Sequence, residues 1–336
     1  MARGLAGGGL ALGILIACIA FAFTVGRFPV TPAELVLALW SRITGIPSGL
    51  PPAIDAVVFS IRGPRIIAAA ACGAALAIAG AAFQGLFRNP LVSPDILGAS
   101  SGAALGAVTG IFLSFGIFGI QAAAFLGGLA AVGAVYAIGA RLRSGDPILT
   151  LVLTGIVMGA LLGAGVGLIK VLADPYNQLP AMTFWLLGSL AGIHSRDIGP
   201  LVVPVVLGAL VLMALRWRMN ALALPEEEAR ALGLPTGPLR LAIIAAATLT
   251  TAASVAAAGM IGWVGLIVPH LARFLVGPDF GRLIPTAALL GGGYLLLIDT
   301  LARTVASIEV PLGILTAVIG TPFFIWLMAS ARGGWS

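Results

Sequence analysis

The stretch RGPRIIAAAACGAALAIAGAAFQGLFRNPLVSPDILGASSGA, residues 62–103, decides the fold of this chain. Arg62 and Arg65 open an apolar span of about 20 residues, which is the length that a helix needs to cross a bilayer. A turn at Arg88-Asn89-Pro90 ends this span, and a second apolar span follows it. A soluble core has no need of such a span between arginines. The pattern therefore predicts a membrane protein with polar groups at work on both faces.

The composition supports a polytopic membrane protein. Of the 336 residues, 60% are hydrophobic and 9% are charged, and the mean hydropathy is +1.12, whereas a soluble domain carries about 25% charged residues. The net charge is +6, but the basic residues are not clustered in one run of sequence. Nothing therefore indicates nucleic-acid binding. Cys18 and Cys72 both lie inside apolar spans, and they predict neither a disulfide nor a metal site.

Ten apolar segments predict an all-α fold with ten transmembrane helices, some of them short or broken, in a single transmembrane domain over residues 1–336. They cover residues 5–26, 66–87, 96–113, 117–140, 147–169, 198–215, 241–258, 261–272, 284–301 and 311–329. The segments at 96–113 and 261–272 are short for a full crossing. A signal peptide is the alternative for residues 5–26, but its apolar part is about 7–15 residues long. We therefore expect a retained first helix.

The basic residues of alternate connections predict the orientation. Eleven of them fall on one side and seven on the other, which places both termini in the cytoplasm. The first set is Arg3, Arg88, Arg141, Arg143, Arg216, Arg218, Arg230, Arg240, Arg273, Arg282 and Arg332, and the second is Arg27, Arg42, Arg62, Arg65, Lys170, Arg196 and Arg303. The outer side keeps arginines that topology does not favour, which suggests that they have a partner.

Glycines at four-residue spacing mark one face of the segment at 147–169. Gly155, Gly159, Gly163 and Gly167 form this stripe, and small residues let helix backbones approach closely in lipid. Helix packing is one interpretation, and a helix bordering a pathway or a dimer seam is the other. A weak inverted repeat between about 62–170 and 240–330 is suggested by IIAAA at both Ile66 and Ile243, an arrangement common in transporters.

The longest predicted cytoplasmic connection is residues 216–240, and it contains the signals of a short capped helix. Pro225 suits the first helical position, Glu226, Glu227 and Glu228 suit its first turn, and Gly233 suits its end. Two or three turns of helix are marginal in water. We therefore expect the membrane domain or a docked partner to hold this segment; a solvated linker is the alternative.

Arg62, Arg65 and Arg303 stand out on the predicted outer face. Arg62 and Arg65 share one side if they are helical. Asp299 precedes Arg303 by four residues, so an internal ion pair is the alternative explanation for Arg303. Seven basic residues on this face oppose five acidic ones, so an acidic protein surface fits here.

The sequence lacks the residues that nucleotide binding and ion-coupled transport usually need. Lys170 is the only lysine and does not follow a glycine, so the chain has no phosphate-binding loop and is not expected to be an enzyme. The spans hold few acidic residues, which argues against an ion-coupled secondary transporter. That transporter, with residues 216–240 as a regulatory linker, stays as the alternative.

The motifs resemble those of the FecCD-type permease subunit of bacterial ABC importers for haem, iron–siderophore complexes and vitamin B12. They are Arg62-Gly-Pro-Arg65, Gln84, Asn89-Pro90-Leu91, Leu97-Gly98, Phe184-Trp185, Pro269-His270-Leu271-Ala272-Arg273, Asp299, Arg303, Pro311-Leu312-Gly313 and Gly320-Thr321-Pro322-Phe323-Phe324. The resemblance covers nearly the whole chain.

The resemblance implies a multi-pass protein of the bacterial inner membrane that works with other subunits. These are a second permease subunit, expected to be an identical copy, two ATP-binding cassette subunits and a periplasmic substrate-binding protein. ATP and magnesium belong to the ATPase, and no cofactor or metal is expected on this chain. Cargo is expected to be haem or an iron–siderophore complex, with vitamin B12 as the alternative.

The resemblance also implies roles for particular residues. Arg62, Arg65 and Arg303 are expected to dock the binding protein, and Asn89, Leu91, Ser144, Gly145 and Asp146 to form the cytoplasmic gate. Contact with the ATPase is expected from Pro225, Glu226, Glu227, Glu228, Ala229, Arg230, Ala231, Leu232 and Gly233.

Overall fold

The computed structural model describes residues 2–142, 147–224 and 226–330, and every regular element in these ranges is helical. The elements are α1 (Ala2–Thr24), α2 (Pro32–Thr44), α3 (Pro52–Asp55), the π-helix η1 (Ala56–Arg62), α4 (Gly63–Leu86), the 3₁₀ helix η2 (Pro94–Leu97), α5 (Ala99–Phe112), α6 (Ile117–Arg141), α7 (Pro147–Leu172), α8 (Gln178–Leu187), α9 (Ser195–Leu222), α10 (Glu226–Ala231), α11 (Thr236–Ala258), α12 (Val264–Val276), α13 (Phe280–Thr304) and α14 (Leu312–Ser330). The prediction of an all-α fold is confirmed.

Within the described ranges, seven helices are long and apolar enough to cross a membrane. Three shorter apolar helices, at Ala99–Phe112, Val264–Val276 and Leu312–Trp326, accompany them. Each of the ten apolar segments coincides with one of these helices, and the segments expected to be short correspond to α5 and α12. That all ten cross the bilayer stays a prediction.

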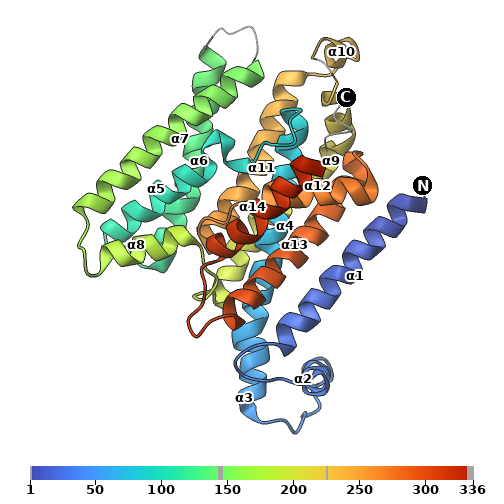
Figure 1. The fold of residues 1–336 in the computed structure, drawn as a ribbon, viewed down its shortest axis with the longest axis vertical. Helices are drawn as coiled ribbons and strands as arrows, with labels where there is room; N and C mark the ends of the chain where they lie inside the picture. Colours follow the sequence, from blue (N-terminus) through green and yellow to red (C-terminus); the bar gives the residue numbers. More distant parts are fainter. Residues whose placement is uncertain (1, 143–146, 225, 331–336) are drawn as a thin grey trace.

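Helix α4 lies at the centre of the molecule and packs against α9, α11, α12 and α13 (Figure 1). Its alanines and glycines allow very close helix contacts. A Cβ at Gly73 would lie 2.1 Å from the carbonyl oxygen of Gly291, and one at Gly80 would lie 2.0 Å from that of Gly265. Only glycine permits such close contacts, because any Cβ would clash with the neighbouring backbone. Close packing of this kind holds helices together in lipid, where no hydrophobic effect drives their association.

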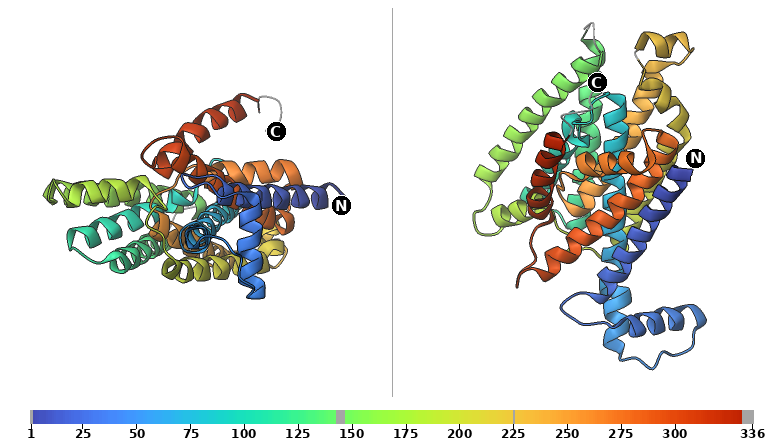
Figure 2. Two further views of the ribbon diagram at one scale, coloured as in Figure 1. Left: turned by 90° about the horizontal axis from the view of Figure 1, so that it is seen from below. Right: turned by 45° about the vertical axis from the view of Figure 1, so that its right-hand side comes forward.

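Helices α5, α6, α7 and α8 form a group on one side of α4, and α1, α12 and α13 lie on the other (Figure 2). The α5–α8 group joins the rest through contacts of α5 and α6 with α11. At one end of the molecule α2 runs across the bundle axis rather than along it, and α10 lies at the opposite end. Helix α1 runs away from the α10 end and α14 runs towards it (Figure 1), which is compatible with the predicted placement of both termini on one side of a membrane. Which side that is stays a prediction.

Each half of the chain pairs a long helix with a short one. Helix α4 is followed by η2 and the 14-residue α5, and α11 is followed by the non-helical residues 259–263 and the 13-residue α12. Trp263 holds a φ of 71°, which is rare for a residue with a bulky side chain. This arrangement is compatible with the inverted repeat over 62–170 and 240–330, which stays a prediction.

The helix that contains α4 starts earlier than the predicted segment at 66–87. Helical structure runs without a break from Pro52 to Leu86, which is 35 residues or about 50 Å, and this exceeds the hydrocarbon thickness of about 30 Å. We therefore expect its first turns to extend beyond the bilayer at the α2 end. There Ile54 and Val58 pack against Leu35 of α2.

Candidate functional site

The sequence Arg62-Gly-Pro-Arg65 sets a change of helix type at the α2 end of the molecule. Pro64 has no backbone N–H, so it removes a hydrogen bond from a regular α-helix. The turns before it are wound as the π-helix η1, in which the N–H of Gly63 donates to the carbonyl of Val58. π turns of this kind are frequent at functional sites. Both Arg62 and Arg65 are directed into the protein, where they are 4% and 8% exposed.

Arg65 binds two carboxylates at once. Its Nε donates to Oδ1 and Oδ2 of Asp299 at 3.0 and 3.1 Å. Its Nη1 and Nη2 donate to the two carboxylate oxygens of Glu309 at 2.9 and 2.8 Å. Arg303 Nε lies 3.3 Å from Oδ2 of Asp299, which confirms the predicted ion pair. We call Arg62, Arg65, Arg303, Asp299 and Glu309 the outer arginine cluster.

Arg62 differs from the other two arginines in its partners. Its Nη1 and Nη2 donate to the backbone carbonyls of Phe23 and Phe28, and in the described part of the chain no carboxylate pairs with it. The last turn of α1 and the connection to α2 therefore cover its guanidinium. Three guanidiniums against two carboxylates leave the cluster with a charge of +1.

Two connections close over the outer arginine cluster and touch each other. Arg27, between α1 and α2, donates to the backbone carbonyls of Ala306 and Ser307, between α13 and α14. Partial burial opposes the ionisation of Glu309, yet the hydrogen bonds from Arg65 and the charges of Arg65, Arg303 and Arg27 lower its pKa below the ordinary value. Glu309 is therefore an anion at neutral pH.

The turn after α4, at the opposite end, contains two of the predicted gate residues. Asn89 Oδ1 accepts from the N–H of Leu91 at 2.9 Å, and the N–H of Asn89 donates to the carbonyl of Gln84 at 3.1 Å. Both side chains are exposed, Leu91 to 55%. Arg88 takes a positive φ of 48°, and its Nη1 lies 3.4 Å from the carbonyl of Leu224, which precedes α10. Ser144, Gly145 and Asp146 lie outside the described residues.

A buried polar link holds the end of α4 against α12. The Nε2 of Gln84, which is 2% exposed, donates to the carbonyls of Gly265 and Leu266 at 3.2 and 3.3 Å. Arg273 Nη1 in turn donates to Gln84 Oε1 at 2.6 Å. Gln84 and Arg273 are 189 residues apart, and the sequence did not predict their contact. A glutamine in an otherwise apolar span was the available signal, because a buried amide needs hydrogen-bond partners.

Helix α10 covers part of the segment predicted to contact an ATPase. Gly233 ends it with a φ of +77° and donates its N–H to the carbonyl of Arg230 at 2.9 Å, so the predicted glycine stop is confirmed. Ala229 is 1% exposed, and α10 contacts α9 and α11, whereas Leu232 is 64% exposed. Pro225 lies outside the described residues. The membrane domain thus holds one face of α10 and leaves the other open.

The glycine stripe of α7 is divided between two environments. A Cβ at Gly155 would lie 2.1 Å from the carbonyl oxygen of Ile96 in η2, and one at Gly159 would lie 3.8 Å from the hydroxyl of Ser101. Gly163 and Gly167 have no neighbouring atom within 4 Å of such a Cβ. Apolar side chains next to Gly167 are exposed too, with Leu168 at 61% and Val171 at 81%.

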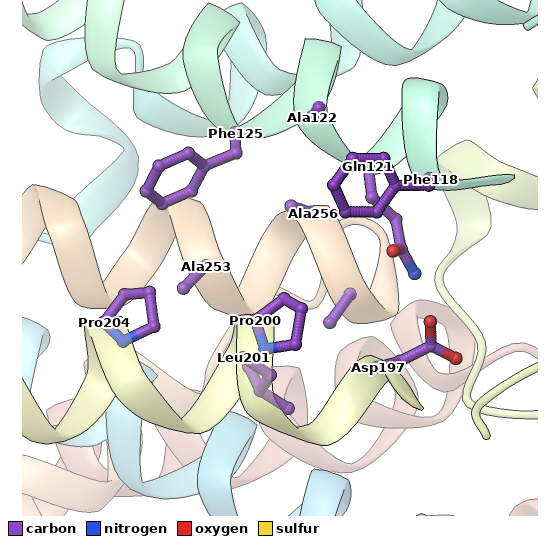
Figure 3. A pocket seen from close by; sticks show the side chains of 11 residues that line it. Phe118, Gln121, Ala122, Phe125, Asp197, Pro200, Leu201, Pro204, Ala253 and Ala256 are labelled. Atoms are coloured by element: carbon purple, nitrogen blue, oxygen red, sulfur yellow. The ribbon is translucent and has the colours of Figure 1, made fainter. Parts of the chain in front are cut away.

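Two apolar cavities lie between α6, α9 and α11. The first, of about 210 Å³, is lined by Phe118 and Phe125 of α6 and by Pro200 and Pro204 of α9, with Asp197 at its rim (Figure 3). The second, of about 570 Å³, lies along the same three helices. Neither cavity borders α7. In the described residues no three His, Cys, Asp or Glu side chains gather as metal ligands.

These features define a class of protein. A helical membrane chain with polar clusters at both ends and no nucleotide-binding loop is built as the membrane component of a transporter. Residues 14–330 match the FecCD transport family, and the chain belongs to this family. It is accordingly the permease of an ABC importer of the metal-chelate type, in which a partner ATPase hydrolyses ATP. The family prediction is confirmed.

Known relatives are similar over most of the chain. The molybdate import system permease protein MolB of Haemophilus influenzae is 37% identical over 327 residues, 97% of this chain and 96% of MolB. The cobalamin import system permease protein BtuC of Halobacterium salinarum is 44% identical over 281 residues, 83% of this chain and 75% of BtuC. A solved structure described as "an inward-facing conformation" of an ABC transporter of the metal-chelate type has a TM-score of 0.87 and 36% identity, and the match covers 96% of this chain and 98% of that one.

Proposed function

We propose that this permease moves haem or an iron–siderophore complex from the periplasm to the cytoplasm by alternating access, with vitamin B12 as the alternative cargo. It works as a homodimer in the bacterial inner membrane, with two ATP-binding cassette subunits and a periplasmic binding protein. The observation that carries this proposal is the family match over residues 14–330. The exposed outer half of α7 supports it.

The exposed face of α7 supports a pathway between two copies of the chain. Only 6% of the residues in the apolar stretch of α7 are buried, and a Cβ added at Gly163 or Gly167 would meet no neighbouring atom within 4 Å. A second subunit related by two-fold symmetry presents the same face, as closed homodimers do. The path then runs between two smooth apolar helices, which suits a bulky cargo that must not be held on its way.

The outer arginine cluster is proposed as the docking site of the binding protein. Its charge of +1, together with Arg27 beside it, favours an acidic partner surface, because complementary charge steers and orients association. Arg62 supports this role because it lacks a carboxylate partner within the described chain. Its guanidinium is held by backbone carbonyls alone, and an acidic side chain from outside supplies the missing charge.

The residues at the α10 end are proposed to connect the ATPases to the gate. The exposed face of α10, including Glu227, Glu228 and Leu232, is the contact surface for an ATPase subunit. A movement of α10 reaches Arg88 through the carbonyl of Leu224, and Arg88 is adjacent to Asn89. The residues act through position, and no chemical step occurs on this chain.

The cargo is the least specific part of the proposal. The phrase TFWLLGSLAG, residues 183–192, resembles haem permeases, whereas the two relatives described above are named for molybdate and cobalamin. The apolar lining gives few polar groups with which to select a ligand. We therefore assign selectivity to the binding protein.

Transport by the complete complex tests the function. The permease, ATPase and cognate binding protein are placed in proteoliposomes, and ATP-dependent uptake of haem, a ferric siderophore, cobalamin and molybdate is measured in parallel. The expected result is uptake of haem or the ferric siderophore that stops when a non-hydrolysable ATP analogue replaces ATP. Uptake of molybdate alone contradicts the proposed cargo, and uptake with the analogue contradicts the ATP-driven mechanism.

Docking is tested with Arg62→Gln, and the matched control is Arg196→Gln, an exposed outer arginine outside the cluster. We expect Arg62→Gln to weaken the stimulation of ATPase activity by the binding protein and to leave basal activity unchanged. Arg196→Gln is expected to behave as wild type. Equal stimulation in the two variants removes the docking claim.

A further inference from the structure

The two carboxylates that hold Arg65 occupy different environments. Asp299 lies within α13 and its side chain is 1% exposed, whereas the Glu309 side chain is 34% exposed. Glu309 stands on the short connection 305–311, and its neighbours Val305 and Ile308 are 65% and 75% exposed. Asp299 is therefore a fixed partner of Arg65, and Glu309 is a partner that can leave.

The contact between Arg65 and Glu309 has the geometry of recognition between two proteins. A guanidinium that presents two parallel N–H groups to both oxygens of one carboxylate forms a bidentate pair, which is strong and specific in orientation. Here the bonds of 2.9 and 2.8 Å come from the chain's own Glu309. A partner's acidic side chain would need the same two donors.

The charge of the cluster depends on whether Glu309 is in place. With Glu309 bound, three guanidiniums face two carboxylates and the charge is +1. When Glu309 leaves, only Asp299 remains and the charge is +2. Arg27 is close enough to add to this field, because it contributes to the lowered pKa of Glu309.

We propose that the outer arginine cluster is a self-masked docking surface, in which Glu309 occupies Arg65 until an acidic side chain of the binding protein displaces it. The inference rests on the docking role proposed above and adds its regulation. Displacement of the 305–311 connection also breaks the contact of Arg27 with Ala306 and Ser307, which uncovers the side of the cluster nearest Arg62. Val305 and Ile308 are then available as an apolar rim for the partner.

The connection leads directly to elements in the middle of the fold. The N–H of Leu312 donates to the carbonyl of Gly188 at 2.9 Å, and a Cβ at Gly313 would lie 2.7 Å from the carbonyl oxygen of Leu187 and 3.1 Å from that of Met260. Movement of residues 305–311 therefore acts on the start of α14 and on the non-helical residues 259–263. Docking outside is linked in this way to the interior of the protein.

The test compares Glu309→Gln with Glu34→Gln in the complete complex in lipid nanodiscs. Both variants remove one negative charge from the predicted outer face. Among the described residues, the side chain of Glu34 bonds only to Thr31, within the capping box of its own helix, α2. Affinity for the cognate binding protein is measured by biolayer interferometry. We expect Glu309→Gln to bind about threefold to tenfold more tightly than wild type, and Glu34→Gln to stay within about twofold of wild type.

The outcomes separate masking from docking. Equal affinities for Glu309→Gln and Glu34→Gln overturn the masking of Arg65 by Glu309. Docking through charge is tested on the wild-type complex by its salt dependence, which needs no substitution in the buried cluster. Affinity that falls between 0.05 and 0.5 M salt supports docking, and affinity that does not change overturns docking and masking together.

Discussion

Replacing Gly155 in α7 by alanine is expected to disturb the contact between α7 and η2. The new Cβ would lie 2.1 Å from the carbonyl oxygen of Ile96, whereas real Cβ atoms keep at least 3.0 Å. The two backbones must therefore separate by about 1 Å, and such overpacking costs about 1–3 kcal/mol. Because η2 follows the turn that holds Asn89 and Leu91, the shift reaches the proposed gate.

Gly163→Ala is the matched control, since Gly163 lies on the same stripe of the same helix with nothing within 4 Å. Alanine gains about 1 kcal/mol of helix propensity over glycine, and this gain is common to both sites. The difference between the two variants therefore isolates the overpacking, and we expect Gly155→Ala to be about 1–3 kcal/mol less stable than Gly163→Ala.

The assay is the free energy of unfolding of the purified permease in SDS titrations of mixed micelles, followed by uptake per ATP hydrolysed in the complete complex. Gly155→Ala should lower both quantities relative to Gly163→Ala. Equal unfolding free energies and equal uptake would refute the close contact at Gly155. The variant Gly163→Leu tests the exposed half of the stripe. We expect it to lower uptake by the assembled complex. Unchanged uptake would mean that this face of α7 contacts lipid.

Three further outcomes follow from the polar contacts. Asp299→Asn should lower the unfolding free energy by about 3–5 kcal/mol, because a buried ion pair loses one partner, whereas the exposed control Asp55→Asn should lie within about 0.5 kcal/mol of wild type. Arg88→Ala should lower uptake per ATP while basal ATPase activity persists, with Arg141→Ala as the inner-face control; coupling that is equal in the two variants removes the proposed link. The lowered pKa of Glu309 stabilises the folded state above pH 4.5, its ordinary pKa, and this contribution is lost as the pH falls through the folded pKa. The melting temperatures of wild type and Glu309→Gln should therefore differ at pH 7 and converge at low pH, and a difference that persists there contradicts the ion pair.

Local patterns predicted a large part of the fold. The seven long apolar helices and the three shorter ones each appear as an apolar segment, and the four-residue spacing of Asp299 and Arg303 predicted an ion pair that the structure confirms. The capping box at Thr31 and Glu34 also marks α2 in the sequence, but α2 has only 13 residues and is not among the ten predicted segments. Signals within one helix turn depend only on neighbouring residues, and they are therefore readable.

Contacts between distant residues could not be predicted in this way. Arg65 and Glu309 are 244 residues apart, and nothing in the local sequence of either residue names the other. The stripe of α7 shows the same limit, because four equivalent glycines in the sequence have different surroundings once η2 packs against Gly155 alone. The start of the α4 stretch at Pro52 was missed because Arg62-Gly-Pro-Arg65 interrupts the apolar run and looks like the start of a helix, although apolar residues also precede it.

The central claim is that this chain is a permease with no energy source of its own. The direct measurement is uptake of haem and of a ferric siderophore into proteoliposomes that hold the permease alone, under an imposed proton or sodium gradient and without nucleotide. We predict no accumulation until the ATPase subunits, the binding protein and ATP are added together. Accumulation driven by the ion gradient alone would contradict the claim and identify an ion-coupled carrier.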